Sequence, residues 1–530
     1  MSDSDKRPSG AGDPEKSSCS VETLPPLAIG MLIALCAVKF LLHAFTSIHR
    51  YGYFRDELYL LDCGRHLAWG YVDMAPLSAV YARIALLMGG SLPALRIIPA
   101  LAGTGLVALT ILITLQLGGN RFAQVLAGLC VLLTPVNLVM DDILSMNSIE
   151  PLFWMGCVYV LIRIIRTGDS KLWIWFGLLA GFGLENKHST FFFGFAVFFA
   201  IALNHWRREY AKPWIWLGGG IALLIFLPNL VWQMHRNFPT LQDLENVRHI
   251  GKNVVLSPLA FIAQQIVMEQ PAFAIVWIAG LVSLLRGSGK RFRVLGVTFL
   301  IFFATLLILH GKDYYLAPIY PMMIAAGAVA VERWLVHRRS VAVRRWPKVA
   351  IAAAVVILGG ILAPLAIPVF SPQRYLAYAD ALHIHLAKTE VHQSSALPQF
   401  FADQFGWRSL VRQIADIYNS LPADERAKTG IWAGNYGEAG AVNLFGPAYG
   451  LPPAYSRHQN YWYWGPPAED YTNLIVIQWD FQDVKDSCTS WQAFDHYDRW
   501  GMAEENAPIY LCRGIKFDIQ KIWWHSHQWN

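Results

Sequence analysis

The sequence predicts a polytopic α-helical membrane protein with about eleven transmembrane helices, followed by a C-terminal α/β domain. Three observations support this fold class. The 530 residues are 55% hydrophobic and only 15% charged, whereas soluble domains carry roughly 25% charged residues. Long apolar runs recur between Leu27 and Val369, and clusters of Lys and Arg occupy alternate loops between them. The 21 Trp residues also fit the aromatic belts of membrane proteins.

The apolar runs define the predicted spans, because a helix needs about 20 apolar residues to cross a bilayer. The predicted spans are Leu27–Ile48, Leu92–Leu117, Phe122–Met140, Pro151–Ile165, Leu172–Leu184, Thr190–Leu203, Trp214–Gln233, Pro271–Leu285, Val294–Leu309, Pro318–Leu335 and Val349–Val369. A shorter amphipathic run, Ala75–Met88, predicts a helix that lies in the membrane interface.

The charges of the loops predict the orientation of these spans. Four basic clusters fall on alternate loops: Arg163, Arg166 and Lys171; Arg207, Arg208 and Lys212; Arg286, Lys290, Arg291 and Arg293; Arg338, Arg339, Arg344, Arg345 and Lys348. The positive-inside rule places all four in the cytoplasm, together with the amino terminus. The other loops then lie outside: Tyr51–Pro76, Asp141–Glu150, Glu185–Ser189, His235–Gln270 and His310–Ala317. The net charge of +6 therefore reflects topology and gives no indication of a nucleic-acid partner.

Three regions follow from this pattern. Residues 1–23 are polar and predict a disordered cytoplasmic tail, residues 24–370 form the transmembrane domain, and residues 371–530 form an extracytoplasmic α/β domain. The last region contains one helix-like and three strand-like stretches: Phe405–Leu421, Gly430–Ala433, Leu474–Trp479 and Ile509–Cys512. Cys488 and Cys512 can form a disulfide there if the domain lies outside the cytoplasm. The turn Gly434–Gly446 is only weak evidence for a nucleotide site.

The first outer loop, Tyr51–Pro76, is the strongest candidate for chemistry. It carries Arg55, Asp56, Glu57 and Asp73 among aromatic residues. Charged groups at membrane depth are costly and are usually functional. The alternative is a solvated acidic loop, in which Arg55 and Glu57 in particular face water.

The adjacent carboxylates Asp141 and Asp142 allow two interpretations. They follow an apolar run and precede the next span. They cap a helix terminus, or they line the rim of a cavity and bind a divalent cation or a sugar. Oxygen ligands of this kind suit Mg²⁺ or Mn²⁺, and Asp73 and Glu57 are further candidate ligands.

Two lysines on outer loops break the positive-inside pattern. Lys187 stands beside His188, and Lys312 precedes the pair Tyr314 and Tyr315. Both lysines fit recognition of an anionic lipid head group, although a lysine also reaches the interface simply to place its charge in water. In the C-terminal region Trp462 and Trp464 lie in a run of four aromatic residues, which predicts either stacking on a sugar, as Tyr314 and Tyr315 also allow, or anchoring to the membrane.

The order of these motifs resembles glycosyltransferase family 39, which includes the protein O-mannosyltransferases and the bacterial transferases that add aminoarabinose to lipid A. The motifs are Arg55-Asp56-Glu57, Gly70-Tyr71-Val72-Asp73 with Pro76, Asp141-Asp142 with Asn147, Asn186-Lys187-His188, and Lys312-Asp313-Tyr314-Tyr315 with Pro318. The resemblance covers about Leu27 to Val369. Met74-Ala75 departs from it, because another polar or basic residue often occupies that place in the family.

The resemblance implies a C-type glycosyltransferase fold in the bacterial inner membrane. The donor would be a hexose or pentose on a polyprenyl phosphate, and the acceptor would be an extracytoplasmic hydroxyl. The catalytic carboxylate of the family maps onto Asp56, and the later acidic residue of the loop maps onto Asp73.

The predicted chemistry needs one general base, because a polyprenyl phosphate leaves as an anion without a proton. Asp56 is the predicted base. Positive charge for the phosphate would come from Lys187, His188, Lys312 and Arg55. A transporter or flippase of lipid-linked sugars is the alternative, but such proteins show broken helices at the bilayer midplane and internal repeats, and no repeat is visible here.

Overall fold

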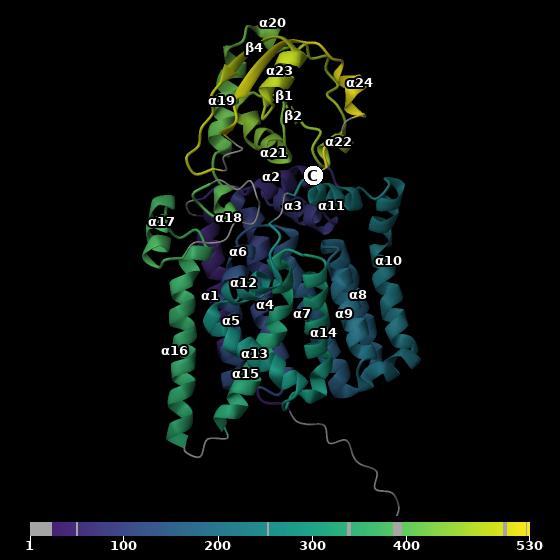
Figure 1. The fold of residues 1–530 in the computed structure, drawn as a ribbon, viewed down its shortest axis with the longest axis vertical. Helices are drawn as coiled ribbons and strands as arrows, with labels where there is room; N and C mark the ends of the chain where they lie inside the picture. Colours follow the sequence, from purple (N-terminus) through teal and green to yellow (C-terminus); the bar gives the residue numbers. More distant parts are fainter. Residues whose placement is uncertain are drawn as a thin grey trace, which may run out of the picture.

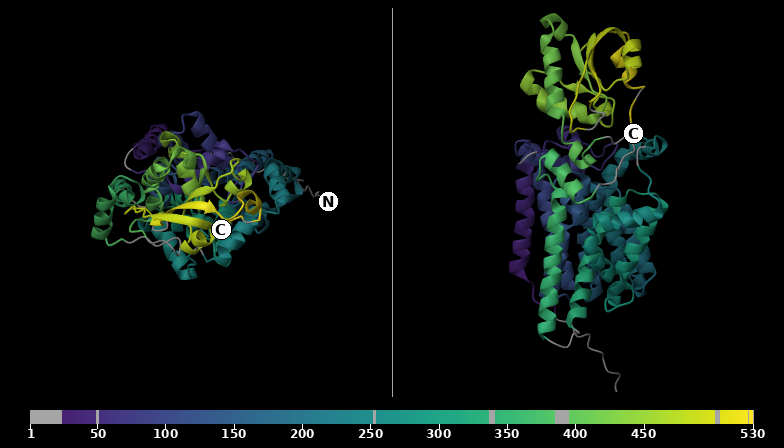
Figure 2. Two further views of the ribbon diagram at one scale, coloured as in Figure 1. Left: turned by 90° about the horizontal axis from the view of Figure 1, so that it is seen from above. Right: turned by 60° about the vertical axis from the view of Figure 1, so that its left-hand side comes forward.

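The computed structural model describes residues 24–48, 51–251, 254–336, 341–384, 395–501, 506–525 and 527–529. Figure 1 shows a tall molecule, in which a bundle of helices carries the C-terminal domain on one end. Two further views show that this domain lies over one end of the bundle and not beside it (Figure 2). The predicted disordered tail, residues 1–23, lies outside the described residues.

Seven segments of the described chain are helical, long and apolar enough to cross a membrane. These segments comprise α1 (Ile29–Ile48), α4 (Leu92–Gln116), α7 (Met146–Thr167), α10 (Pro213–His235), the segment Lys290–Ile308 with α14 (Arg293–Ile308), the segment Asp313–Val336 with α15 (Tyr320–Val336), and most of α16 (Val341–Ala366). An eighth span results if α12 (Pro258–Met268) and α13 (Pro271–Leu285), which meet at 107°, count as one. The polytopic α-helical class is thereby confirmed.

The predicted number of about eleven spans is too high by this measure. Every predicted span contains a helix, but α5 (Arg121–Leu133), α8 (Trp173–Asn186), α9 (Thr190–Ala202) and α13 have only 13 to 15 residues. At about 1.5 Å per residue, such a helix is shorter than the roughly 30 Å of a bilayer core. The run predicted as Phe122–Met140 is broken at Pro135, where the six-residue α6 (Pro135–Met140) begins.

The predicted first outer loop, Tyr51–Pro76, contains the helix α2 (Arg55–Arg65). Helix α3 (Leu77–Leu87) follows it, so the helix predicted within Ala75–Met88 is confirmed. The Glu57 carboxylate accepts a hydrogen bond from the backbone N–H of Phe54 at 2.9 Å and so caps the first turn of α2. Helices α2, α3 and α11 (Pro239–His249) form a layer between the bundle and the C-terminal domain (Figure 1).

The C-terminal domain contains, within the described residues, a five-stranded mixed sheet of order β2-β1-β3-β5-β4. Its strands are β1 (Thr429–Trp432), β2 (Ala454–Tyr455), β3 (Asn473–Ile477), β4 (Cys488–Phe494) and β5 (Ile509–Ile515). Pairs β1–β2 and β1–β3 are parallel, and pairs β3–β5 and β4–β5 are antiparallel. The three predicted strands are confirmed as β1, β3 and β5. A disulfide joins Cys488 to Cys512, as the sequence allows.

Helices cover both faces of this sheet or lead into it. They are α17 (Pro372–Ala381), α18 (Gln399–Ala402), α19 (Trp407–Ser420), α20 (Ala423–Arg426), α21 (Tyr436–Phe445), α22 (Tyr461–Trp464), α23 (Phe481–Ser487) and α24 (Ile519–Trp523). The predicted helix Phe405–Leu421 is confirmed as α19.

One hydrophobic cluster connects the C-terminal domain with the bundle. It includes Leu58 and Leu61 of α2 and Leu95 of α4, together with Ile414 of α19 and Ile475 of β3. Because the burial of apolar surface is the main favourable term in folding, this shared core holds α2 against the C-terminal domain.

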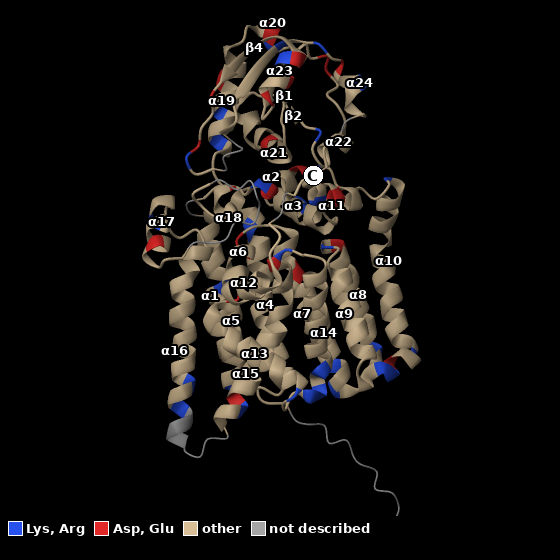
Figure 3. Ribbon diagram, in the orientation of Figure 1, with Lys and Arg blue, Asp and Glu red and all other residues tan. Residues whose placement is uncertain are grey.

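The charges of the bundle are asymmetric. Lys and Arg gather at the end that lies away from the C-terminal domain, around the ends of α8, α9 and α14 (Figure 3). The predicted alternation of basic loops thus corresponds to one basic end of the folded bundle.

Candidate active site

Helix α2 turns one polar face towards the C-terminal domain. Asp56, Tyr59, Asp62 and His66 recur every three or four residues, a spacing that aligns side chains along one helix face. The partly buried Asp56 accepts a hydrogen bond at Oδ1 from the hydroxyl of Tyr436 in α21, at 2.9 Å. The predicted base is therefore in direct contact with a side chain of the C-terminal domain.

Asp73, the later acidic residue of the loop, lies close enough to Asp56 for their charges to interact. The Tyr59 hydroxyl donates to Asp73 Oδ1 at 3.2 Å. Burial, and then the charges of Asp243 in α11 and of Asp56, raise the pKa of Asp73 from 3.8 to about 7. The structure thus brings together the two carboxylates that the sequence singled out, and it adds Asp243.

The aromatic run of α22 divides between two environments. Trp464 stacks on His66 of α2, with ring centroids 4.4 Å apart, and the Tyr461 hydroxyl donates to Asp62. Trp462 instead packs among tryptophans of the last residues, and its indole N–H donates to the backbone oxygen of Trp523 at 2.8 Å. Of the two predicted stacking residues, Trp464 lies beside α2, and Trp462 packs within the C-terminal domain.

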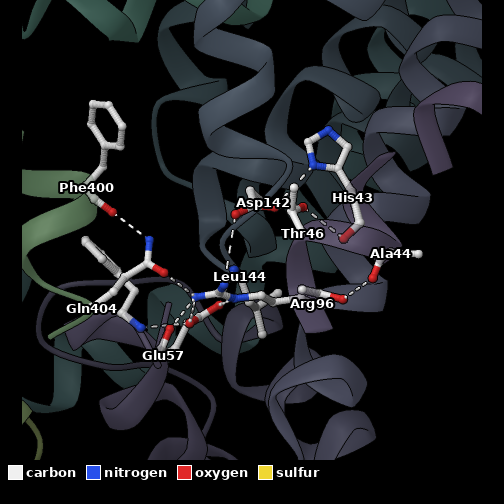
Figure 4. Close-up of polar contacts among 12 residues, drawn as sticks. His43, Ala44, Thr46, Glu57, Arg96, Asp142, Leu144, Phe400 and Gln404 are labelled. Atoms are coloured by element: carbon white, nitrogen blue, oxygen red, sulfur yellow. Dashed lines mark hydrogen bonds and ion pairs between the residues drawn. The ribbon is translucent and has the colours of Figure 1, made fainter. Parts of the chain in front are cut away.

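Glu57 does not face water, as the sequence interpretation allowed, but is fully buried (0% exposed). It binds Arg96 of α4 through two N–H groups, at 2.9 and 3.1 Å, and accepts the backbone N–H of Leu144 at 2.9 Å (Figure 4). Because these donors and the Phe54 N–H occupy both carboxylate oxygens, Glu57 serves the packing of α2 and not a metal site.

Asp141 and Asp142 fit neither predicted role, because both are buried inside the bundle at 2% and 3% exposed. Asp141 pairs with Lys39 of α1 at 2.7 Å. Asp142 accepts the Thr46 hydroxyl and lies 3.9 Å from the Arg96 guanidinium (Figure 4). The cap of α7 is Ser145, so the two carboxylates stabilise the packing of α1, α4 and α6.

Lys187 and the Lys312 loop lie together, although the sequence separates them widely. Lys187 Nζ donates to Glu150 and to Asn147 of α7, each at 2.8 Å. The same ammonium lies 4.4 Å from the ring centroid of Tyr315. Because Glu150 balances its charge, Lys187 acts mainly as an ordered N–H donor beside an aromatic ring.

Two further predicted phosphate ligands have partners of their own. His188 Nε2 lies 3.0 Å from Asn229 Oδ1, and the Asn229 amide donates to the backbone oxygen of Trp69 at 2.9 Å. This series of hydrogen bonds connects the loop of Lys187 to the loop of Asp73. Arg55 is only 8% exposed, contrary to the interpretation that it faces water, and it pairs with Asp403 at 3.4 Å.

Lys312 differs from Lys187, His188 and Arg55 in how little of its charge is balanced by a partner. Within the described chain it makes no ion pair shorter than 4 Å, and its ammonium lies 5.9 Å from the ring centroid of its neighbour Tyr314. Its charge is therefore the least compensated among the predicted phosphate ligands.

The divalent cation that the sequence allows stays a prediction. In the described part of the chain, no three His, Cys, Asp or Glu side chains converge as metal ligands. The acidic candidates Glu57, Asp141 and Asp142 bind cationic side chains instead.

Sequence reasoning missed the contribution of α21. Tyr436, which contacts Asp56, lies within the turn that gave only a weak nucleotide signal. Two glycines within that turn have a packing role: a Cβ on Gly437 would approach Arg55 Cγ to 2.6 Å, and one on Gly440 would approach the Leu58 backbone to 2.8 Å. The spacing of small residues in α21 was the available signal, because small residues let two helices approach closely.

The comparisons with known proteins agree with this picture. The family model described as dolichyl-phosphate-mannose-protein mannosyltransferase matches residues 73–232. That match includes Asp73, Lys187 and His188 but not Asp56 or Lys312. No curated protein matches the sequence.

Two solved structures of ArnT from Cupriavidus metallidurans resemble the whole chain. The apo structure has a TM-score of 0.56 at 14% identity, and it covers 92% of this chain and 98% of its own. The structure bound to undecaprenyl phosphate has a TM-score of 0.54 at 13% identity, with coverages of 91% and 98%. The resemblance of this chain to glycosyltransferase family 39 is thus confirmed, and its fold is the C-type glycosyltransferase fold.

Proposed function

We propose that the chain is an integral membrane glycosyltransferase, which moves a sugar from a polyprenyl-phosphate donor to a hydroxyl of an extracytoplasmic lipid, glycan or protein. The observation that carries this proposal is the contrast among the carboxylates. Glu57, Asp141 and Asp142 are neutralised by buried cations. Asp56 is instead partly exposed, at the contact between α2 and the C-terminal domain, where it accepts the Tyr436 hydroxyl. Its exposure lets an acceptor hydroxyl reach it as a base.

In this reaction Asp56 takes the proton of the acceptor hydroxyl. The acceptor oxygen forms a bond to the anomeric carbon of the donor sugar. The bond from that carbon to the phosphate oxygen breaks, and its electron pair leaves with the polyprenyl phosphate. The departing anion needs positive charge but no proton, and Lys312, with the Lys187 N–H groups beside Tyr315, would supply it.

The proposed setting is the bacterial inner membrane, with the amino terminus in the cytoplasm and the C-terminal domain outside. The basic end of the bundle supports this orientation by the positive-inside rule (Figure 3). The disulfide of the C-terminal domain supports it as well, since disulfides persist in oxidising compartments. The undecaprenyl phosphate in the second ArnT structure supports a polyprenyl-phosphate donor.

The test replaces Asp56 with Asn in a strain from which the gene has been deleted. Mass spectrometry of membrane lipids and envelope glycans should detect a sugar modification with the wild-type gene and lose it with Asp56→Asn. Protein levels in the membrane should stay equal. Asp424→Asn, which alters an exposed carboxylate of α20, is the matched control and should keep the modification. Normal modification with Asp56→Asn would refute the assignment of the base.

A further inference from the structure

The contact between α21 and α2 includes the proposed base, Asp56. The glycines of α21 let its backbone approach α2 at Arg55 and Leu58. This close approach places Tyr436, the first residue of α21, opposite Asp56, so that the hydroxyl donates to Asp56 Oδ1 at 2.9 Å. The rest of α2 is also held by this domain, through the bond from Asn443 to Asp62 at 2.7 Å.

Tyr436 is itself fixed from three sides. Its backbone N–H donates to His458 Nδ1 at 3.2 Å, and the two rings lie 5.0 Å apart. On its other side, the Tyr59 ring lies 5.0 Å away. Asn435 caps the helix, because its side chain accepts the backbone N–H of Glu438 at 3.0 Å. A tyrosine held in this way has its hydroxyl aimed at Asp56 before any substrate binds.

The electrostatic environment keeps this hydroxyl a donor. Burial, and then the charge of Asp56, raise the pKa of Tyr436 well above its usual value. The phenol therefore stays protonated at neutral pH and throughout the acidic range in which carboxyl groups titrate. A hydrogen bond to a carboxylate favours the charged form, so this bond favours ionised Asp56.

We propose that Tyr436 of the C-terminal domain is a positioning residue for the transfer reaction, which orients Asp56 and keeps it ionised through its hydroxyl. This inference rests on the proposed function. It gives the C-terminal domain a role in the chemistry of the membrane half, because the domain supplies a partner of the base from a position 380 residues further along the chain.

Asp56 and Tyr436 face several other charged or titratable groups. Asp73 of the same outer loop interacts with Asp56, and Asp243 of α11 interacts with Asp73. Arg55 acts on Tyr436 from the α2 side, and His458 contacts it from within the C-terminal domain. All of these groups remain in a Tyr436→Phe variant, so the variant isolates the hydroxyl.

The experiment measures protonation of Asp56 directly and needs no substrate. A water-soluble carbodiimide with glycinamide modifies protonated carboxyl groups of the purified, full-length protein over a range of pH. Trypsin cleavage after Arg55 and Arg65 releases a peptide with Asp56, Glu57 and Asp62, and fragmentation mass spectrometry assigns the label to each residue. In the Tyr436→Phe variant, the labelling midpoint of Asp56 should rise by about one pH unit.

Tyr510→Phe is the matched control, because Tyr510 is a buried tyrosine of β5 that lies on the other face of the sheet, away from α2. In the Tyr510→Phe variant, the labelling midpoint of Asp56 should equal the midpoint in the wild type. Glu57 reports on folding, because it is fully buried and should stay unlabelled in every folded variant. An unchanged Asp56 midpoint in folded Tyr436→Phe overturns the proposal.

If Glu57 becomes labelled in Tyr436→Phe, the variant has lost its fold, and a second measurement decides. Fluorotyrosine incorporated at position 436 keeps the shape of the side chain but makes the hydroxyl a stronger donor. The Asp56 midpoint should then fall below that of the wild type, and an unchanged midpoint refutes the role of Tyr436. The activity of Asp56→Asn tests the proposed function separately: if that variant is inactive and the midpoint does not respond to Tyr436, only the present inference fails.

Discussion

Two adjacent carboxylates on α2 have opposite surroundings. Successive side chains on an α-helix diverge by about 100°, so Asp56 points to the Tyr436 hydroxyl while Glu57 points into the bundle and binds Arg96. Arg96 also donates to Gln404 at 3.1 Å, which connects this buried ion pair to the C-terminal domain (Figure 4). Glu57 therefore stabilises the fold, and its neighbour Asp56 is the residue proposed as the base.

We expect Glu57→Gln to lower the free energy of unfolding by about 3 kcal/mol, because it leaves the buried Arg96 charge without its counter-ion. Thermal unfolding of the purified protein in detergent measures this loss. Asp56→Asn should change stability by less than about 0.5 kcal/mol, since its carboxylate is partly exposed. The double variant Glu57→Gln/Arg96→Met should recover part of the loss. If Glu57→Gln and Asp56→Asn proved equally stable, the structural role assigned to Glu57 would be contradicted.

The sequence predicts which residues are unusual but not which of them meet. Asp56, Asp73, Lys187 and Tyr315 stand out because charged or aromatic groups interrupt apolar runs. The partners of Glu57 and Asp141 lie 39 and about 100 residues away, in other helices, and no local pattern reveals them. A carboxylate that serves packing and one that serves as a base are identical in sequence, and only the tertiary partner separates them.

The contact between helices α21 and α2 determines where Tyr436 lies relative to Asp56. The two helices approach so closely that a Cβ on Gly440 would lie 2.8 Å from the Leu58 carbonyl carbon and 2.9 Å from its oxygen. Both atoms belong to the backbone, which cannot rotate away as a flexible side chain can. The proposed active-site geometry therefore depends on a position at which only glycine fits.

We predict that Gly440→Ala moves α21 away from α2 and lowers stability by about 1–3 kcal/mol. Because the shift also withdraws Tyr436 from Asp56, transfer activity should fall by an order of magnitude or more. Gly220→Ala in α10 is the control, since nothing lies within 4 Å of a Cβ there, and it should leave stability equal or higher by up to about 1 kcal/mol. Thermal unfolding and product analysis measure both effects, and equal behaviour of the two variants would refute the packing argument.

Apolar runs predict helices well and their lengths poorly. The run Phe122–Met140 is apolar throughout, yet Pro135 lacks the N–H that a continuous helix needs and so starts a new one. In the run around α8 and α9, Lys187 lies between two short helices and pairs with Glu150 of α7. Composition alone cannot separate a full span from such shorter helices, so the predicted runs outnumber the seven or eight described segments that are long enough to cross a membrane.

At the scale of the whole molecule, one end is basic and the other carries the C-terminal domain with its disulfide (Figures 1 and 3). The proposed site lies at the second end, where α2 meets α21. If this end faces the outside, a cytoplasmic nucleotide sugar cannot reach Asp56, and the donor must be a lipid that presents its sugar at the outer surface. The orientation in the membrane thus decides the class of donor.

We expect an impermeant maleimide, added to intact spheroplasts, to label the variant Ala423→Cys but not Arg208→Cys. Both positions are exposed. Ala423 lies in α20, the helix at the far tip of the C-terminal domain (Figure 1), and Arg208 lies in the basic connection between α9 and α10. After the membrane is permeabilised, both variants should react. Cys19 is replaced by Ser in both variants so that it adds no background. The free cysteines of the described residues contribute little, because Cys63, Cys130 and Cys157 are buried and Cys36 lies within α1. Labelling of Arg208→Cys alone in intact spheroplasts would invert the orientation, and a lipid-linked donor at the outer leaflet would then no longer be required.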